Sequence, residues 1–455
     1  MTLKSINPST GEIINEYNEM TLKEVNDILE KSNKAFLSWR KKSFSERSGM
    51  MKKSADILLN NRDKYATLMA KEMGKPIKQG RAEIEKCAWV CNYYANNTEN
   101  FLQQEIIKTE ISKSLVTFQP LGVIIAVMPW NFPFWQVFRF IAPTLMAGNA
   151  CILKHASNVS GCALAIEDII QRANFPRDIF RTLLVNNNKI EEILENPIIK
   201  AATLTGSTPA GRAIASKAGE MIKKTVLELG GSDPYLILED ADIDSAVTEC
   251  IASKLINSGQ SCISAKRFII DKAVREPFEK LFVQKMRDVV HGNPMEESTK
   301  LGPLARHDIR DNLHTQVLDS IEKGAKCLLG GTIPEGKGFY YPPTVLTDVK
   351  KGMHAYNEEL FGPVASIIPV NNEKEAIRVA NDSPFGLGAA VFTNDVIKGE
   401  RIAINELDAG CCSVNTHIKS DPRLPFGGIK ESGYGRELSH QGVKEFINIK
   451  TILVK

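Results

Sequence analysis

The hydrophobic pattern of the chain changes near residue 114. Before this point, residues 21–105 carry apolar side chains at helical spacing, with Ile84, Ala88 and Cys91 on one stripe. After it, the segment 114–130 is rich in β-branched and aliphatic residues, as is typical of strands. The chain is therefore expected to begin with helices and to continue with strands.

Start and stop signals divide the helical region. Ser45 belongs to the residue types that cap helix N-termini, so a helix is predicted to begin there. Gly74 followed by Pro76 predicts the end of that segment. Cys87 and Cys91 lie one helical turn apart and could pair on a metal. Because no histidine or third cysteine lies near them, packing in the core is the favoured interpretation.

Strands and helices alternate along the rest of the chain. The first series comprises strands at 150–154, 200–206 and 224–231 and helices near 159–173 and 208–218. The second comprises strands at 234–240, 267–271, 326–331, 365–370 and 389–393 and helices from 243, at 274–290 and at 373–381. Such alternation is typical of βαβ units and parallel sheets, so we predict an α/β protein with two lobes and a cleft between them.

Composition narrows the class of protein. The 455 residues suggest about two or three domains. Hydrophobic residues make up 43% and charged residues 24%, and the net charge of +3 provides no strong field for nucleic acid or a membrane. The nine cysteines show neither a CxxC pair nor zinc spacing, and the N-terminus lacks a signal-peptide pattern. We therefore expect a cytosolic protein without a metal site.

Three segments carry side chains that are suited to catalysis. "PWNFPFWQVFRF" (129–140) places the amide of Asn131 and the guanidinium of Arg139 in an apolar run. Cys262 lies in the small, polar stretch "LINSGQSCISAKR", and a nucleophilic cysteine needs such access. Glu228 lies between two leucines, where desolvation should raise its pKa toward that of a general base. Each also has a structural interpretation: a buried thiol, a strand-end carboxylate and an arginine paired with a buried carboxylate.

A fourth segment, "LTGSTPAGR" (204–212), has the form of a strand, a glycine turn and a helix start. Exposed N–H groups at a helix N-terminus attract phosphate. The segment does not match the GxGxxG pattern, so an ordinary connection between a strand and a helix remains an equally good interpretation of these residues alone.

Taken together and in order, these motifs resemble the NAD(P)-dependent aldehyde dehydrogenase family. The resemblance covers nearly the whole chain, from "INPSTGE" to the C-terminal strand, and is carried by "PWNFP", "LTGST", "LELGGSDP", "GQSC", "EELFGPV" and "PFGGIKESGYGRE". It implies a Rossmann-type dinucleotide-binding domain, an α/β catalytic domain and a small β oligomerisation extension. The corresponding residues are 1–112 with 128–230, then 231–420, and finally 113–127 with 433–455. A homodimer or homotetramer is implied as well.

The resemblance also implies catalytic roles. Cys262 would attack an aldehyde to give a thiohemiacetal and then a thioester, and Glu228 would activate the water that hydrolyses it. Asn131 and the Cys262 N–H would stabilise the oxyanion, a contribution of about 3–4 kcal/mol for one such donor. The residues implied to bind the cofactor are Trp130, Lys154, Thr205, Gly206, Ser207, Glu359 and Phe361.

One departure bears on the choice between NADP and NAD. Members of the family that prefer NAD often have Glu three residues after the lysine matched by Lys154, where it binds the ribose 2′-hydroxyl. This chain has Ser157 there. A serine can donate a hydrogen bond to a 2′-phosphate while Lys154 supplies charge, so NADP is the predicted cofactor and NAD a possible one.

Arg139 and Ser420 match substrate-binding residues of the succinate-semialdehyde branch of the family. A guanidinium can hold the distal carboxylate of the substrate with two parallel hydrogen bonds. Some members have a second arginine six residues before the nucleophile, where this chain has Ile256. Lys419 or Arg423 could compensate. The resemblance therefore implies oxidation of succinate semialdehyde to succinate.

Three alternatives remain open at this point. The chain could be a broad-specificity dehydrogenase of aliphatic or aromatic aldehydes in which Arg139 is merely structural. It could also be a non-catalytic protein that keeps the fold, since fold does not imply function. An acyl-CoA-forming dehydrogenase is disfavoured by Glu228, because that chemistry need not activate water. Cys411 and Cys412 could form a redox switch with Cys262, although packing beside a strand is the favoured interpretation.

Overall fold

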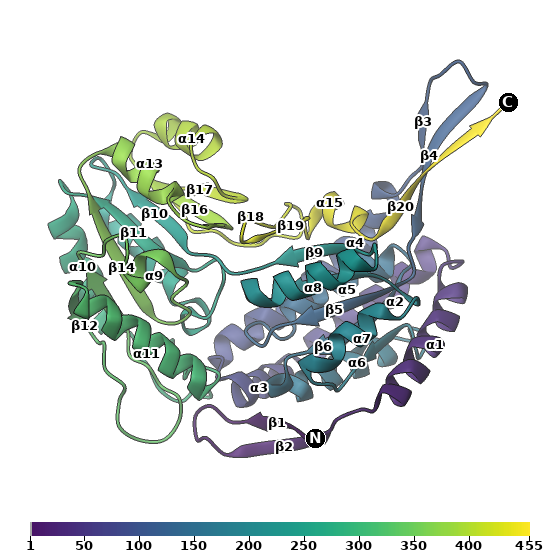
Figure 1. The fold of residues 1–455 in the computed structure, drawn as a ribbon, viewed down its shortest axis with the longest axis horizontal. Helices are drawn as coiled ribbons and strands as arrows, with labels where there is room; N and C mark the ends of the chain where they lie inside the picture. Colours follow the sequence, from purple (N-terminus) through teal and green to yellow (C-terminus); the bar gives the residue numbers. More distant parts are fainter. Residues whose placement is uncertain (1) are drawn as a thin grey trace.

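The computed structural model describes residues 2–455, which form two α/β lobes and a projecting arm (Figure 1). A six-stranded sheet lies in the first lobe and a seven-stranded sheet in the second. The chain enters the second lobe after β9 (Lys224–Glu228) and returns through β18 (Ile429–Lys430) and β19 (Gly433–Tyr434). The predicted α/β class with two lobes is confirmed.

The N-terminal region is a hairpin followed by helices. β1 (Thr2–Ile6) pairs antiparallel with β2 (Ile13–Asn18). The four helices that follow are α1 (Leu22–Trp39), α2 (Phe44–Asn60), α3 (Arg62–Met73) and α4 (Ile77–Phe101). Their apolar faces belong to the same buried cluster as the six-stranded sheet, so these helices are part of the first lobe.

The predicted helix start at Ser45 is wrong by two residues. Ser43 is the N-cap of α2, because its side chain accepts from the Glu46 N–H while the Glu46 carboxylate accepts from the Ser43 N–H. A glutamate three residues downstream favours Ser43 over Ser45. Gly74 ends α3 with a φ of 77°, a left-handed conformation that glycine adopts without a Cβ penalty.

The six-stranded sheet has the order β19-β9-β8-β5-β6-β7, in which only β19 is antiparallel to its neighbour. The order reverses between β5 and β8, a point at which ligands bind in open α/β sheets. The remaining strands and helices of this lobe between residues 123 and 220 are β5 (Val123–Met128), α5 (Trp135–Met146), β6 (Ala150–His155), η1 (Ser157–Val159), α6 (Ser160–Arg172), β7 (Phe180–Thr182), η2 (Asn187–Lys189), α7 (Ile190–Glu195), β8 (Ile199–Thr205) and α8 (Thr208–Glu220).

The seven-stranded sheet has the order β12-β13-β14-β11-β10-β16-β17 and is parallel except for the β12–β13 pair. Its strands are β10 (Asp233–Ile237), β11 (Ala265–Asp271), β12 (Lys326–Leu329), β13 (Thr344–Thr347), β14 (Val364–Val370), β16 (Gly388–Phe392) and β17 (Cys411–Val414). Its helices are α9 (Ile243–Lys254), η3 (Ile256–Gly259), α10 (Arg275–Arg287), α11 (His307–Glu322), α12 (His354–Asn357), α13 (Glu373–Asn381) and α14 (Val396–Asn405), and β15 (Phe385–Gly386) pairs with β18.

The arm is a three-stranded sheet that projects from the first lobe (Figure 1). β4 (Lys113–Pro120) lies between β3 (Glu105–Ile107) and β20 (Ile447–Val454), which follows α15 (Ser439–Lys444). The segment 113–127 assigned to the extension therefore divides. Residues 113–120 lie in the arm, whereas residues 123–127 lie in the centre of the six-stranded sheet, because this apolar strand is buried on both faces.

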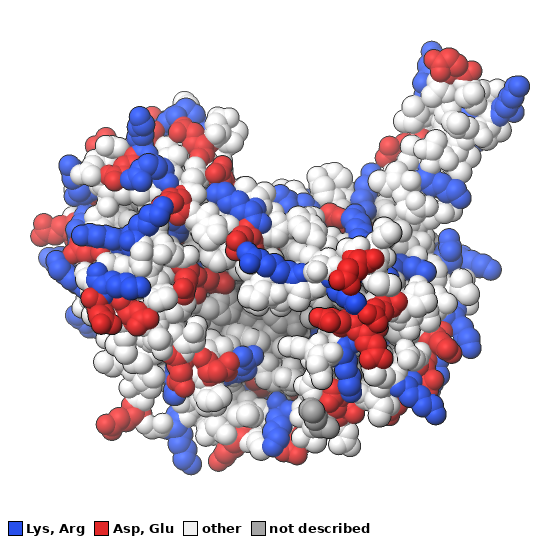
Figure 2. All heavy atoms as spheres, viewed as in Figure 1, with Lys and Arg blue, Asp and Glu red and all other residues white. Residues whose placement is uncertain are grey.

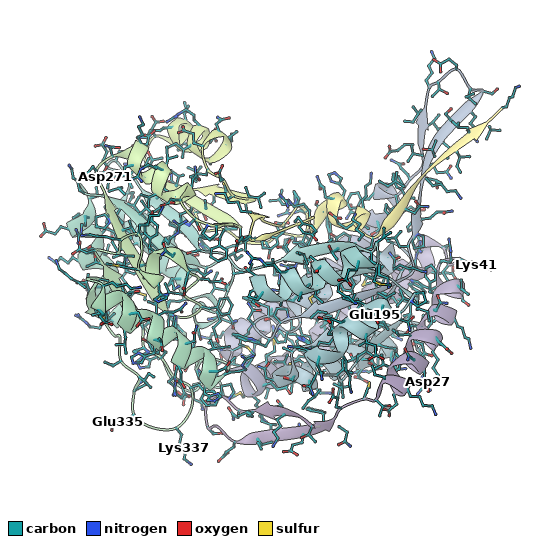
Figure 3. All side chains as sticks on the ribbon, in the orientation of Figure 1. Asp27, Lys41, Glu195, Asp271, Glu335 and Lys337 are labelled. Atoms are coloured by element: carbon teal, nitrogen blue, oxygen red, sulfur yellow. The ribbon has the colours of Figure 1, made fainter. Side chains whose placement is uncertain are left out.

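Many charged side chains lie at the surface, although some, such as Glu228, Arg139 and Lys266, are buried. On the face drawn in Figure 2, basic and acidic side chains alternate around a recess between the two lobes. Glu335 and Lys337 lie on the long connection between β12 and β13, at the lower edge of Figure 3. Cys87 and Cys91 are both buried in the core, in agreement with the packing interpretation. No helix within residues 2–455 is long and apolar enough to cross a membrane.

Candidate active site

Cys262 lies between two cavities. The first, of about 460 Å³, is lined by the carboxyl ends of β5, β8 and β9 and by α11, and it includes Asn131, Thr205 and Glu359. The second, of about 560 Å³, is lined by α4, α5 and α9 and includes Arg139 and Ser420. Only Cys262 and Gln136 line both. One thiol can thus face two different molecules, one in each cavity. From the roles that the family resemblance implies, we call the first the cofactor cavity and the second the substrate cavity.

The loop before Cys262 has an unusual backbone. Asn257 and Ser258 have φ values of 52° and 58°, and Gly259 follows with a φ of 77°. A Cβ on Gly259 would lie 2.1 Å from the Gly362 carbonyl oxygen, so only glycine permits this close approach. Residues held in sparsely populated backbone conformations cluster at active sites, where the surrounding structure maintains them.

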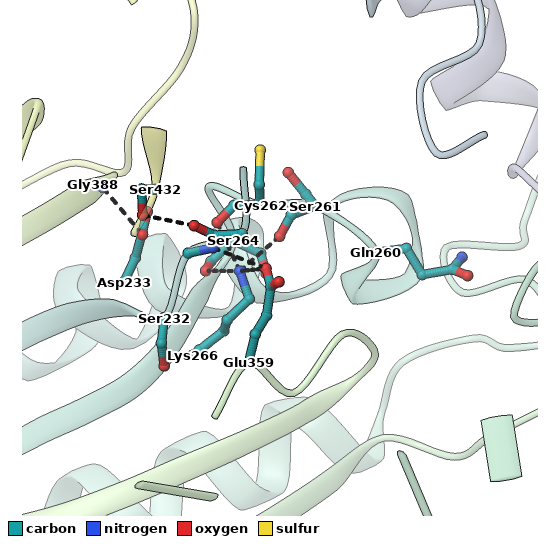
Figure 4. A network of polar contacts seen from close by, with 12 residues as sticks. Ser232, Asp233, Gln260, Ser261, Cys262, Ser264, Lys266, Glu359, Gly388 and Ser432 are labelled. Atoms are coloured by element: carbon teal, nitrogen blue, oxygen red, sulfur yellow. Dashed lines mark hydrogen bonds and ion pairs between the residues drawn. The ribbon is translucent and has the colours of Figure 1, made fainter. Parts of the chain in front are cut away.

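Lys266 holds this loop together (Figure 4). Its fully buried ammonium donates to the carbonyl oxygens of Ser261, at 2.8 Å, and Cys262, at 2.7 Å, and lies 3.2 Å from a Glu359 carboxylate oxygen. The same oxygen of Glu359 accepts from the Gly231 N–H at 3.2 Å. Lys266 therefore couples the position of the thiol to that of a carboxylate in the cofactor cavity.

Burial and nearby positive charges act in opposite directions on the pKa of the Cys262 thiol. Burial raises the pKa of its thiol to about 12, although the charges of Lys266 and Arg139 oppose this shift. Cys262 is nevertheless partly exposed toward the cavities, unlike five of the other cysteines, which are buried. An accessible thiol beside two cations is suited to nucleophilic attack once a base removes its proton.

Asn131 is held rigidly at the end of β5. Its Nδ2 donates to the Gln260 carbonyl at 3.0 Å, and its own carbonyl accepts from Asn257 Nδ2 at 2.6 Å. The PWNFP segment is thereby tied to the loop that carries Cys262. Asn131 is buried and lines the cofactor cavity beside Cys262, and its second amide hydrogen is available to an oxyanion.

Glu228 is buried at the end of β9, and its pKa lies well above the usual value because of desolvation and the nearby carboxyl of Glu437. The predicted upward shift is confirmed. One carboxyl oxygen lacks a hydrogen-bond partner and points toward Gly427, where a Cβ would lie 2.7 Å away. Glu228 lines neither cavity in this conformation, so its carboxyl must rotate to reach a group bound to Cys262.

Arg139 is buried on α5 and already has a carboxylate partner. Its Nε contacts Glu437, its Nη2 lies 3.5 Å from the Thr205 hydroxyl, and its guanidinium lies 4.8 Å from the centre of the Phe426 ring. The structural interpretation of Arg139, a pair with a buried carboxylate, thus describes this structure. Arg139 also lines the substrate cavity, so a second carboxylate can approach it from that side.

Ser420 lies in the substrate cavity beside a cation that the sequence analysis missed. Lys86, from α4, donates to the Ser420 hydroxyl at 2.7 Å and lies 4.3 Å from the centre of the Trp135 ring. Lys419 is exposed at the rim of this cavity. Arg423 is bound by Asp421. Lys86 lies 43 residues before the first catalytic motif, which begins at Pro129, and belongs to none of the motifs, so no local signal marked it.

The cofactor cavity has the features of a dinucleotide site. Thr205, Gly206 and Ser207 line it where β8 leads into α8, and Ser207 is the N-cap of that helix. The free N–H groups of a helix N-terminus suit a pyrophosphate. Trp130 and Phe361 line the same cavity and meet edge to face, with ring centres 5.7 Å apart.

Lys154 lies near the end of the next strand of the same sheet, and Ser157 lies just after that strand. Lys154, near the end of β6, is paired with Val127 of β5, and Ser157 begins η1. Lys154 contacts the amide oxygen of Asn187, and burial lowers the pKa of its ammonium to about 8. Neither residue lines the 460 Å³ cavity. Asn187 is a further polar neighbour that no motif marked.

Two more buried polar residues support the PWNFP segment. His155 Nε2 lies 2.9 Å from the Pro133 carbonyl, and burial lowers the pKa of this histidine to about 4. Glu83 accepts from the N–H groups of Phe134 and Trp135 at 2.9 Å each, so it caps the start of α5. The sequence analysis assigned no role to either, because their partners lie 22 and 51 residues away.

A thiol, an amide donor and a buried carboxyl around a dinucleotide-binding sheet edge define a class of oxidoreductase that forms covalent intermediates. A family model described as "Aldehyde dehydrogenase family" matches residues 1–452. The chain belongs to the aldehyde dehydrogenase family.

Similar proteins with assigned activities indicate a particular branch of this family. A probable NADP(+)-dependent succinate-semialdehyde dehydrogenase of Synechocystis is 48% identical over 454 residues, with both chains fully covered. An NADP(+)-dependent succinate-semialdehyde dehydrogenase of Mycobacterium tuberculosis is 45% identical over 457 residues, again with full coverage. A crystal structure of succinic semialdehyde dehydrogenase from Streptococcus pyogenes in complex with NADP+ superposes with a TM-score of 0.97, at 35% identity and 99% coverage of both chains.

Proposed function

We propose that this protein oxidises succinate semialdehyde to succinate and prefers NADP over NAD. The observation that carries the proposal is the position of Cys262 between two cavities, which separates a dinucleotide from a small aldehyde. The names of relatives at 45–48% identity over the whole chain support the substrate and the cofactor. Arg139 and Ser420 in the substrate cavity support an aldehyde with a distal carboxylate.

In the first step the Cys262 sulfur forms a bond with the aldehyde carbon as a base accepts the thiol proton. Negative charge develops on the aldehyde oxygen, where Asn131 Nδ2 and the Cys262 N–H donate hydrogen bonds. Since these donors are held in place before the reaction, they stabilise the oxyanion without reorganisation. Bound NADP+ supplies the acceptor for the hydride that leaves carbon as the oxyanion collapses, and a thioester on Cys262 remains.

In the second step the Glu228 carboxylate takes a proton from water, which attacks the thioester and releases succinate and the thiol. The raised pKa of Glu228 suits a base that must release its proton again near neutral pH. Because Glu228 must be ionised to accept a proton, hydrolysis should accelerate as pH rises through its raised pKa. Rotation of its carboxyl out of the pocket beside Gly427 precedes this step.

The residues around the cofactor cavity fit NADP. The N-terminus of α8 would hold the pyrophosphate, Glu359 would hold the nicotinamide ribose, and the Trp130–Phe361 pair would bound the nicotinamide. Lys154 contacts an amide rather than a carboxylate, so its positive charge remains available to a 2′-phosphate. Ser157 lies three residues further on, at an exposed position that can donate to the same group.

A substrate panel with both cofactors tests the proposal. The kcat/KM values for succinate semialdehyde, glutarate semialdehyde, butanal and benzaldehyde would be measured with NADP and with NAD. We expect succinate semialdehyde with NADP to be the best pair by at least tenfold. Equal values across the panel would instead support a broad-specificity aldehyde dehydrogenase in which Arg139 only pairs with Glu437.

We further propose that the protein is a homo-oligomer assembled through the arm. β3 and β20 are the two edge strands of the arm sheet, and exposed edges invite pairing with another chain. Ile106, Ile449 and Leu453 are 78%, 61% and 61% exposed, which is unusual for large apolar side chains that project from a lobe. Light scattering after gel filtration should give a dimer or tetramer, and an Ile449→Lys variant should dissociate. A monomeric wild-type protein at micromolar concentration would contradict this.

A further inference from the structure

Lys86 is a cation in the substrate cavity without a carboxylate partner among residues 2–455. The two carboxyl groups that act on it electrostatically are Glu83 and Asp421. Glu83 is bound by the buried ammonium of Lys75, and Asp421 is bound by Arg423. Among residues 2–455, the Lys86 ammonium donates a hydrogen bond only to the neutral Ser420 hydroxyl. A cation in this position lacks the counter-ion that partly buried charges normally have.

The surroundings of Lys86 favour an anion over water. Lys86 lines the substrate cavity and is partly buried, and its ammonium rests against the face of Trp135. Arg139 lines the same cavity and repels Lys86, since its charge contributes to lowering the pKa of the lysine. A carboxylate that enters this cavity would relieve the repulsion and supply the missing counter-ion. Because Ser420 accepts from Lys86, its own hydroxyl proton can be donated to the same ligand.

Arg139 differs from Lys86 in this respect, because Glu437 already compensates its charge. The position six residues before Cys262, Ile256, lines the cavity but is apolar. We propose that Lys86, with Ser420, binds the distal carboxylate of the aldehyde substrate and takes the place of a second arginine. This inference rests on the proposed function, since it requires a substrate that carries a carboxylate.

The test compares one ratio across variants: kcat/KM for succinate semialdehyde divided by kcat/KM for butanal, which lacks the carboxylate. Lys86→Met keeps the length of the side chain and removes its charge, and it should lower the ratio at least tenfold, mainly through a higher KM for succinate semialdehyde. Lys86→Arg should keep the ratio within about threefold of wild type. Lys78→Met, an exposed lysine on the same helix, is the matched control and should leave the ratio unchanged.

The outcomes separate the two proposals. A wild-type ratio near one would overturn the proposed substrate. A high wild-type ratio that Lys86→Met leaves intact would overturn only the role of Lys86. A variant that lost both activities in parallel, with a lower melting temperature, would identify Lys86 as structural and would overturn the role as well.

The pH dependence of the same ratio provides a second measurement on folded proteins. Burial and Arg139 lower the pKa of Lys86 to about 8, against the opposing influence of Glu83, Asp421 and Cys87. The ratio should therefore fall as pH rises through this value in the wild type. Since arginine stays charged, Lys86→Arg should remove the fall. An identical pH profile in both proteins would count against the proposal.

Discussion

The two cavities that meet at Cys262 are built from different parts of the chain. The cofactor cavity is lined by turns at the carboxyl ends of neighbouring strands, such as 205–207 at the end of β8 and 229–230 after β9, and by one face of α11. The substrate cavity is formed by side chains on helices α4, α5 and α9 and on the segment 418–420. If the proposed function is correct, the sheet edge contributes much of the cofactor site, whereas individual side chains on separate elements decide which aldehyde fits.

The two cavities also differ in whether the charged side chains around them have a partner of opposite charge. Beside the cofactor cavity, the buried Lys266 compensates the charge of Glu359, and both are held by backbone groups. In the substrate cavity, Arg139 is compensated by Glu437 but Lys86 has no carboxylate partner among the described residues. A compensated pair positions the loops around it. A cation without a counter-ion selects the charge of the ligand instead.

Removal of the thiol shared by both cavities should have the largest effect. Cys262→Ala should lower dehydrogenase activity by at least about 10³-fold with every aldehyde, because no covalent intermediate can form. Binding of NADP, measured by fluorescence quenching, should persist because the turns of the cofactor cavity are intact. Cys327→Ala, at an exposed cysteine of the second lobe, is the control. Activity that survives the change at Cys262 would refute covalent catalysis.

Removal of the oxyanion donor should have the next largest effect. Asn131→Ala should lower kcat by about 10²–10³-fold, the usual cost of one such donor, with succinate semialdehyde and butanal affected equally. Equal loss is expected because the aldehyde group is common to both substrates. A loss confined to succinate semialdehyde would mean that Asn131 contacts the carboxylate of the substrate. The assignment of Asn131 to the aldehyde oxygen would then be wrong. Rapid-mixing kinetics of NADPH formation provide the measurement.

A change at the far end of the cofactor site should alter only cofactor choice. Ser157→Glu should reduce kcat/KM for NADP relative to NAD by about 10–100-fold, because a carboxylate repels the 2′-phosphate and accepts a hydrogen bond from a 2′-hydroxyl. The ratio for succinate semialdehyde against butanal should stay the same. If cofactor preference is unaltered, another residue near Lys154 must recognise the 2′-phosphate.

The smallest expected effect concerns stability. The folded state holds the proton of Glu228 more tightly than the unfolded state, so its contribution to stability falls as pH rises from the unfolded pKa of about 4.3 toward the raised pKa. Glu228→Gln removes the destabilisation that comes from ionising a buried carboxyl. The variant should therefore gain stability relative to wild type between pH 6 and 8, by a few degrees in melting temperature. Glu110→Gln, at an exposed position, should show no such gain. A pH-independent difference would contradict the assignment.

The motifs around the reaction centre could be predicted because each is contiguous in the chain. Asn131 and Cys262 lie in short segments that also contain the residues that hold them, such as Gln260, which accepts from Asn131. The predicted strand at 150–154 corresponds to β6, which ends one residue later, at His155. Ser43 was missed because Ser45 is of the same residue type, and only the partner Glu46 distinguishes the two. The division of 113–127 between arm and sheet was missed because both parts read as β-strand.

Long-range pairing was not predictable from local patterns. Lys86 and Ser420 are separated by 334 residues. Lys266 binds carbonyl groups of a loop with a left-handed turn, and no sequence motif predicts that turn. The sequence predicted Arg139 as a candidate for a carboxylate but did not identify Glu437 as its partner. Packing of α5 against the returning C-terminal segment brings these two charges together.

The order of apolar and polar residues was enough to predict the α/β architecture, and the family that the contiguous motifs resemble implied the nucleophile and the edge of the sheet that would face the cofactor. Hydrophobic periodicity predicts the architecture because each strand or helix buries its own apolar face. Only the tertiary structure decided which charges are compensated and which remain available to a ligand. Compensation depends on distances between side chains from remote segments, and those distances exist only after the lobes have packed.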